Sequence, residues 1–219
     1  MIRIITISRE YGSGGALVGG ILARKLGWNL VDDPVIAEIA KRANVRPDLA
    51  ARYDECVDPW FHRLLKAIWR GGYEGVATDL GTNLFDADAM AALWHRVIQE
   101  AAKIGHCVIV GRGGQCILRD RRDAFHVSVY APLTEKIARL HEMLQPGPAD
   151  PAALIEEVDN RRAAYVRRHF GEEWTDRHLY NLLISSTIGL EPAADAILCA
   201  AGLKAKSPER SRTNVPGEP

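Results

Sequence analysis

The sequence predicts an α/β protein built on a doubly wound, five-stranded parallel sheet. Short β-branched and apolar runs, typical of strands buried on both faces, alternate along the chain with longer segments of helical periodicity. The first run, at residues 2–7, leads through a glycine-rich turn into a helix. This strand, turn and helix connection is the one that such sheets use at the edge where ligands bind.

Five segments are expected to be strands. The first is IRIITI at residues 2–7, and the others lie at residues 28–32, 106–111, 124–131 and 180–185. Because helical segments separate them, the strands should run parallel with right-handed connections. Their carboxyl ends should therefore meet at one edge of the sheet.

The helical segments carry apolar residues three and four positions apart. The first contains Leu17, Val18 and Ile21, and Gly27 stands where a helix C-cap belongs. Further helices are expected at residues 34–43, 58–70, 86–104, 133–144, about 151–169 and 190–201. The helical and extended segments together account for most of the chain.

The chain is expected to form a single domain over residues 1–203. Its 219 residues, of which 47% are hydrophobic, suffice for one sizeable core. About residues 45–85 interrupt the alternation and are interpreted as an insertion, and about residues 145–178 are interpreted as a lid region. Residues 204–219 lack apolar periodicity and are expected to be a disordered tail.

Charge and composition exclude several classes of function. Lys plus Arg and Asp plus Glu both number 28, so no net charge favours nucleic acid or an anionic membrane. The four cysteines are widely spaced without a C-x-x-C pair, which predicts neither a zinc site nor a disulfide framework. No signal peptide or membrane span is recognisable, so a cytoplasmic location is expected. The oligomeric state stays open.

The segment ISREYGSGGALVG at residues 7–19 has the form of a phosphate-binding loop. A helix N-terminus exposes unpaired N–H groups and a partial positive charge, and glycines let a phosphate approach the backbone. The complete Walker pattern adds a lysine and a hydroxyl residue. When REYGSGGAL is overlaid on a GPSGAGKGT loop, Gly15 replaces the lysine and Leu17 replaces the threonine. Only the backbone cradle is retained.

A dinucleotide-binding turn is the alternative for this loop. Asp32 and Asp33 lie about 20 residues beyond Gly12, where a ribose-binding acid is expected. The third glycine of that pattern would fall at Leu17, however, and four residues separate the first expected strand from Gly12. The spacing therefore favours a phosphate loop and leaves an NAD-dependent oxidoreductase, or a turn without a ligand, as alternatives.

Arg112 is a candidate phosphate ligand in a second turn. The segment IVGRGG at residues 109–114 ends the third expected strand, so this guanidinium should lie at the same sheet edge as the first loop. A guanidinium can hold a phosphate bidentately. The alternative interpretation is a strand-end turn with a solvated arginine.

A third group of arginines lies in VDNRRAAYVRRHFGEEWTDR at residues 158–177. If this segment is helical, Arg161 and Arg168 share a face, while Arg162 and Arg167 point elsewhere. The functional interpretation is a lid whose arginines close over the moving phosphate. The alternative is a solvated charged helix. Four tryptophans among apolar neighbours are expected in the core: Trp60, Trp69, Trp94 and Trp174.

Several segments, in their order along the chain, resemble the cytidylate-kinase-like family of P-loop proteins. They are ISREYGSGG, LVDDPVIAEIA, CVIVGRGGQCILRD, FHVSVYAPLTEKIARL, and RRAAYVRRHFGEEWTD with YNLLIS. The resemblance covers about residues 1–202 and is weakest at about 45–85. It implies a P-loop NTPase-like fold with a helical, acceptor-binding insertion and an arginine-bearing lid. It also implies transfer of phosphate from ATP, with Mg²⁺, to a nucleotide such as CMP.

The resemblance also implies roles for individual residues. Arg112 would grip the acceptor phosphate, and Asp32 or Asp33 would face the acceptor. Arg161 and Arg162 would act from the lid, and Arg9 is the cation nearest to the loop. The donor phosphates would be cradled by Gly12, Ser13, Gly14 and Gly15. No residue is assigned as a metal ligand.

Two departures from the family pattern concern the site. Ala16 stands where an arginine commonly follows the glycines, and Asn181 stands where an acid is common in the final strand. Loss of one charge-stabilising group at a transferring phosphate costs a few kcal/mol, or about a hundredfold to a thousandfold in rate, whereas a backbone cradle can still bind. The sequence is therefore compatible with an active phosphotransferase or with a nucleotide-sensing pseudoenzyme.

Overall fold

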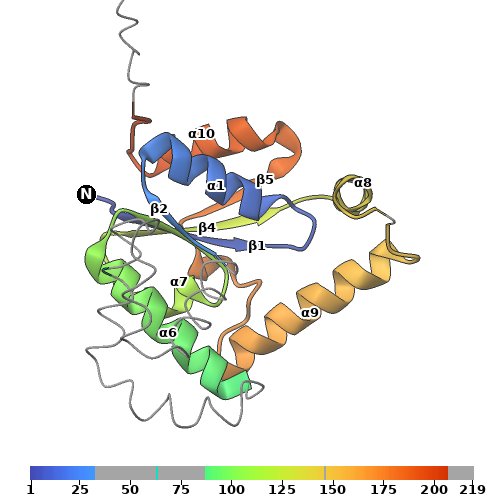
Figure 1. The fold of residues 1–219 in the computed structure, drawn as a ribbon, viewed down its shortest axis with the longest axis horizontal. Coiled ribbons are helices and arrows are strands. Elements are labelled where there is room, and N and C mark those ends of the chain that lie inside the picture. The colour runs from blue at the N-terminus through green and yellow to red at the C-terminus, as the bar shows by residue number, and fades with distance from the viewer. Residues whose placement is uncertain (33–62, 64–86, 146, 207–219) are drawn as a thin grey trace, which may run out of the picture.

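The computed structural model describes residues 1–32, 63, 87–145 and 147–206. They form a five-stranded parallel sheet in the order β2-β3-β1-β4-β5 (Figure 1). The strands are β1 (Ile4–Arg9), β2 (Asn29–Val31), β3 (Cys107–Val110), β4 (Ala124–Tyr130) and β5 (Leu182–Ser185). The predicted five-stranded parallel sheet is confirmed, with β1 at its centre.

Helices flank the sheet on both faces (Figure 1). On one face lie α1 (Gly15–Leu26) and α10 (Leu190–Ala200), and on the other lie α6 (Ala87–Ile104) and the short α7 (Gly114–Ile117). Beyond the carboxyl ends of the strands, α8 (Leu133–Met143) leads into the long α9 (Pro151–Phe170). Two 3₁₀ turns, η2 (Arg177–Leu179) and η3 (Ser186–Ile188), flank β5.

The core lies between the sheet and its helices because β1 is apolar on both faces. Ile4, Ile5 and Ile7 are fully buried in this strand, as its continuous apolar run predicts. On the α1 side, Val18 and Leu22 are fully buried against the sheet. The helix then ends at Gly27, whose left-handed backbone confirms the predicted C-cap.

The strand order argues against the dinucleotide-binding alternative. In this sheet β3 lies between β1 and β2, whereas the dinucleotide fold places its first two strands side by side. The predicted separation of four residues between the first strand and Gly12 was wrong. The strand β1 runs on to Arg9 and leaves only Glu10 and Tyr11 before Gly12. The order of the strands, and not the length of the turn, separates the two folds.

Several expected elements lie outside the described residues. These are the helices at 34–43 and 58–70 and, apart from position 63, the insertion at about 45–85. Of the expected tail, residues 204–206 are described, and the amide of Lys206 donates to the carbonyl of Lys25 at 2.7 Å. Neither α7 nor the two 3₁₀ turns were predicted, because each is no longer than four residues.

Candidate functional site

The glycine loop after β1 presents unoccupied backbone donors at the start of α1. Gly12 and Gly14 both have φ of +78°, and Gly14 caps the helix without a side-chain hydrogen bond. Within the described part of the chain, no hydrogen bond uses the amides of Gly12, Gly14 or Gly15. The loop therefore combines open N–H groups with the positive end of the helix dipole.

Ser13 has a structural role in this loop. Its side chain is fully buried, and its hydroxyl and its amide both donate to the carbonyl of Glu10, at 2.8 and 3.2 Å. Ser13 was expected to cradle phosphate together with the glycines. Since both of its donors are used inside the loop, Ser13 holds the turn closed and the glycine amides remain for a ligand.

The side chain of Arg9 passes between the glycine loop and the turn after β3. A Cβ placed on Gly15 would overlap the Cβ of Arg9, and a Cβ placed on Gly111 would overlap its guanidinium. Both positions therefore require glycine while Arg9 keeps this path. The first carbons of the Arg9 side chain thus lie against the glycine loop, while its guanidinium lies at the turn after β3.

Two basic residues of α8 contact the loop and were missed in the sequence. Arg139 donates to the carbonyl of Gly12 at 2.7 Å, and its Cζ lies 3.2 Å from the position of a Cβ on Gly14. Lys136 is buried, and its Nζ lies 3.0 Å from Oε2 of Glu10. Lys136 and Arg139 are three positions apart, so they lie on the same face of a helix. This spacing is visible in the sequence and could have indicated a basic face on α8.

The helix α9 contacts the residues that precede the first glycine. Oδ1 of Asp159 accepts the amide hydrogen of Tyr11 at 2.7 Å, and Oδ2 lies 3.5 Å from Nζ of Lys136. Arg162 donates to the carbonyl of Arg9 at 2.9 Å and to Oδ1 of Asp159 at 3.3 Å. Burial raises the pKa of Asp159, while the Tyr11 amide, Lys136 and Arg162 act in the opposite direction.

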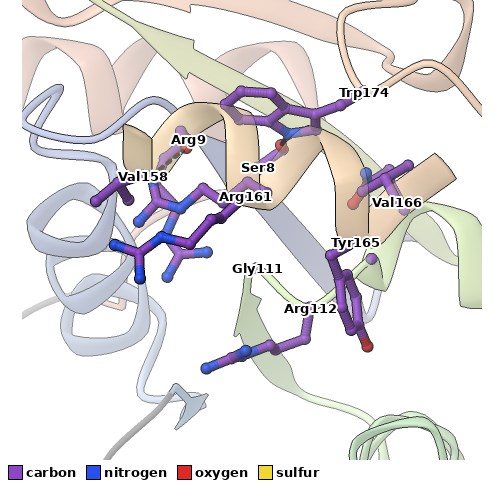
Figure 2. Close-up of a pocket in the computed structure, with 12 residues that line it drawn as sticks. Ser8, Arg9, Gly111, Arg112, Val158, Arg161, Tyr165, Val166 and Trp174 are labelled. Atoms are coloured by element: carbon purple, nitrogen blue, oxygen red, sulfur yellow. Dashed lines mark hydrogen bonds between the residues drawn. The ribbon is translucent and has the colours of Figure 1, made fainter. Parts of the chain in front are cut away.

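Beside these contacts lies a cavity of about 370 Å³ that is rich in arginine. Arg9 enters from β1, Arg112 from the turn after β3, and Arg161 and Arg162 from α9. Figure 2 shows the labelled guanidinium groups toward one end of the cavity and Tyr165 toward the other. Three separate parts of the chain thus bring cations to one place.

The prediction for the faces of α9 was partly wrong. Arg161 and Arg162 both line the cavity together with Tyr165, whereas Arg168 does not line it. Arg167 forms an exposed ion pair with Glu173, with an N–O distance of 2.7 Å. A spacing of seven residues does put Arg161 and Arg168 on the same face of α9. The face of α9 that borders the cavity, however, contains both Arg161 and Arg162.

Arg112 is held in a fixed orientation at the cavity. Its φ is +55°, in the left-handed region that arginine rarely adopts, and its guanidinium lies 4.6 Å from the ring centroid of Trp94. Trp94 is buried, as expected for a core residue. A strained backbone and a stacked guanidinium are features of sites whose geometry is set before the ligand arrives.

Trp174 is a wall of the cavity, although it was expected in the core. Its indole Nε1 donates to Oγ of Ser8 at 2.6 Å, which Figure 2 shows as a dashed line. Tyr180 donates its hydroxyl hydrogen to the carbonyl of Trp174 at 2.7 Å, and burial raises the pKa of Tyr180 to about 12. The segment after α9 is thereby fastened to β1. Trp60 and Trp69 lie outside the described residues.

Of the two acidic candidates, only Asp32 is described, and it is not at this cavity. Asp32 follows β2 at the edge of the sheet and is absent from the cavity lining, and Asp33 lies outside the described residues. In the described ranges, no group of three or more His, Cys, Asp or Glu residues is arranged to hold a metal ion. Among the same residues, no helix has the length and apolarity needed to cross a bilayer.

Comparisons with known structures agree with this topology. An uncharacterised protein from Eubacterium ventriosum ATCC 27560 superposes with a TM-score of 0.65 at 22% identity, covering 92% of this chain and 99% of that one. A shikimate kinase from Bacteroides thetaiotaomicron gives 0.52 at 14% identity, covering 93% and 100% of the two chains. A shikimate kinase from Acinetobacter baumannii, in complex with shikimate, gives 0.50 at 17% identity and 90% and 92% coverage. These likenesses show a P-loop NTPase-like α/β fold.

Sequence comparison gives the family. No curated protein matches the chain. The model of the cytidylate kinase-like family matches residues 4–188, which is most of the chain and includes every described part of the site. By this match the chain belongs to the cytidylate kinase-like family.

Proposed function

We propose that the protein is a phosphotransferase that moves a phosphate from ATP to a nucleoside monophosphate such as CMP. One observation carries the proposal. The open amides of Gly12, Gly14 and Gly15 follow directly on β1, and the same strand delivers Arg9 to a cavity walled by arginines from three parts of the chain. In this proposal the donor phosphates and the acceptor phosphate would bind next to each other.

On the donor side, the glycine amides and the N-terminus of α1 would bind the phosphates of ATP. Arg139 is already bonded to the loop at the carbonyl of Gly12. The Cβ and Cγ of Arg9 lie against Gly15, and its guanidinium lies at Gly111 in the turn after β3. Mg²⁺ usually binds through one or two carboxylates, waters and the substrate phosphates. The metal would therefore be held largely by ATP, and its protein ligands are not assigned.

On the acceptor side, Arg112 would hold the phosphate of the monophosphate through two parallel hydrogen bonds. Its guanidinium already lies over the ring of Trp94, 4.6 Å from the centroid, which restricts its orientation before the acceptor binds. Arg161 and Arg162 line the same cavity from α9 and would stabilise the charge that spreads over the oxygens of the moving phosphate. Arg9 would complete this set from the end of β1.

A coupled assay tests the proposal. The protein is incubated with ATP, Mg²⁺ and a panel of monophosphates that includes CMP, and formation of ADP is followed. Turnover with at least one acceptor is expected. ATP should also raise the thermal unfolding midpoint, while NAD should not, since only ligands of the native state do so. Protection by NAD without protection by ATP would reject the proposal.

A nucleotide-sensing pseudoenzyme is the second candidate function. It is favoured by Gly15 and Leu17, which stand in place of the lysine and the hydroxyl of a complete loop, and the side chain of Leu17 is exposed. This candidate predicts ATP binding without turnover for every acceptor. Arg9→Ala separates the two functions, because an active enzyme should lose about a hundredfold or more in turnover when it loses a stabilising cation.

A further inference from the structure

The carboxylate of Asp159 is surrounded by the donors that proteins use to bind phosphate. Its Oδ1 accepts the amide hydrogen of Tyr11 at 2.7 Å and a hydrogen bond from Arg162 at 3.3 Å. Its Oδ2 lies 3.5 Å from Nζ of Lys136. A backbone amide, an ammonium and a guanidinium are also the groups of a phosphate-binding loop.

This anionic group lies beside the candidate donor site. Tyr11 immediately precedes Gly12, which has the first of the open amides of the loop. The side chain of Asp159 is 16% exposed and that of Lys136 is 11% exposed, so the two charges interact largely out of water. A negative charge is therefore held next to the place where a nucleotide would bring further negative charge.

We propose that Asp159 is a positioning residue whose carboxylate takes the place of a phosphate oxygen while no nucleotide is bound. In that state it holds α9 against the residues before the glycines. When ATP binds, the carboxylate releases Lys136 and Arg162, and both cations turn to the phosphates. The inference rests on the proposed function only in that the incoming ligand is a nucleotide phosphate.

The surroundings of Asp159 suit such an exchange. Burial raises the pKa of its carboxyl although three donors oppose that shift, so the ionised group is poorly solvated and depends on these partners. Lys136 keeps a second carboxylate, because Oε2 of Glu10 lies 3.0 Å from its Nζ. Lys136 would therefore stay beside the loop after Asp159 releases it. The cation that the loop lacks in sequence would be supplied from α8.

The test compares Asp159→Asn with the unmodified protein. Asparagine keeps the shape of the side chain and an oxygen that can accept the Tyr11 amide hydrogen, but it removes the charge. Binding of inorganic tripolyphosphate, measured by calorimetry, should become about threefold to tenfold tighter, since a competing charge has been removed. The KM for ATP should fall by a similar factor. Unchanged or weaker binding would overturn the inference.

Glu156→Gln is the matched control. Glu156 lies on the same helix, is exposed and is not among the residues that line the cavity. Its replacement removes the same charge from α9 and should leave tripolyphosphate binding unchanged, because exposed charges are screened. An equal gain in both variants would mean that the net charge of the helix acts, and not the exchange at Asp159.

A crystal structure of the unmodified protein with a non-hydrolysable ATP analogue gives a second test that does not depend on the variant folding. The expected result is Lys136 or Arg162 on a phosphate oxygen and Asp159 released from both. If Asp159 keeps all three of its partners beside a bound triphosphate, the inference is wrong while the proposed function stands. If neither ATP nor tripolyphosphate binds, both fail.

Discussion

Arg9 lies where a side chain at position 15 would begin. A Cβ on Gly15 would overlap the Cβ of Arg9 and would lie 3.2 Å from both the Cγ of Arg9 and the Cβ of Val129. The position that carries lysine in a complete Walker loop is thus closed by the protein's own arginine. The glycine that makes the loop look incomplete in sequence has a steric reason to be there.

Gly15→Ala should destabilise the protein and displace Arg9. Overpacking of this kind typically costs about 1–3 kcal/mol in the free energy of unfolding. Gly20, on the same helix, has no atom within 4 Å of an added Cβ. Gly20→Ala should therefore be stabilising by about 0.5–1 kcal/mol through helix propensity alone. Urea unfolding of both variants checks this, and equal stabilities would contradict the packing at Gly15.

The same packing predicts that Gly15→Lys will not create or raise phosphotransferase activity. The lysine can enter only by moving Arg9, so one cation is exchanged for another in a distorted loop. The coupled assay with ATP and CMP measures the effect. A clear gain in turnover would show that Arg9 does not serve the loop.

Arg112→Lys should raise the KM for the acceptor monophosphate although it keeps the positive charge. Lysine cannot form the bidentate contact and does not stack on Trp94 as a planar group. A hydrogen bond to a charged group contributes about 1.5–3 kcal/mol, so the KM should rise roughly tenfold to a hundredfold. Steady-state kinetics at saturating ATP measure it.

Arg119→Ala is the control for this experiment. Arg119 lies a few residues beyond Arg112, and its exposed guanidinium pairs with Glu172 at 2.6 Å. Surface pairs of this kind contribute about 0–1 kcal/mol. The KM of this variant should stay near that of the unmodified protein, and an equal rise in both variants would contradict a direct role of Arg112.

Arg139→Ala should weaken ATP binding more than acceptor binding. The variant loses the donor to the carbonyl of Gly12 and the positive charge beside Gly14. The loss of one charge-assisted bond corresponds to about tenfold or more in the dissociation constant for ATP. Calorimetry with ATP measures this, and Arg24→Ala is the control because Arg24 is 70% exposed in its pair with Glu191. Unchanged ATP affinity would exclude Arg139 from the donor site.

His126 should make the protein less stable as the pH falls. It is buried, its Nδ1 lies 2.7 Å from Oγ1 of Thr6, and burial lowers its pKa below 6.5, with the backbone at Leu118 acting in the opposite direction. The unfolded chain therefore takes up a proton before the folded one does. Stability should be lost as the pH falls below about 6.5 toward the lowered folded pKa, by at most about 1.4 kcal/mol per pH unit.

Urea unfolding at a series of pH values measures this dependence. His126→Gln should flatten the profile in the acidic range, because it removes the group that titrates differently in the two states. A profile that is equally steep in the His126 variant would assign the dependence to other groups.

Much of the fold could be predicted from the sequence because its strands are continuous apolar runs. The runs at 106–111 and 124–131 became β3 and β4 with shifts of no more than one residue at either end. The boundary of β1 was harder, because Ser8 and Arg9 are polar residues at the end of a buried strand. Both residues belong to the strand because they pair with β4, and a pairing between distant segments cannot be predicted from the local sequence.

The candidate site could be predicted only in part. Arg112 lies at the same sheet edge as Arg9, as predicted, because strand ends in a parallel sheet share an edge, and its role as a phosphate ligand stays a prediction. Lys136, Arg139 and Asp159 were missed because their roles depend on how α8 and α9 turn toward the loop, which is tertiary information. Trp174 was misassigned to the core from its apolar neighbours; it is half-buried, and its indole N–H donates to Ser8.

Because residues 9–12 are bonded to α8 and α9, this glycine loop cannot be transferred alone to another protein. Grafting a lysine-containing Walker segment into the chain would take Glu10 from Lys136 and disturb the bond between the Tyr11 amide and Asp159. Moving this loop into another protein would remove its contacts with α8 and α9. To replace this loop by a lysine-containing Walker loop, whether by engineering or in evolution, residues of α8 and α9 have to change together with the glycines.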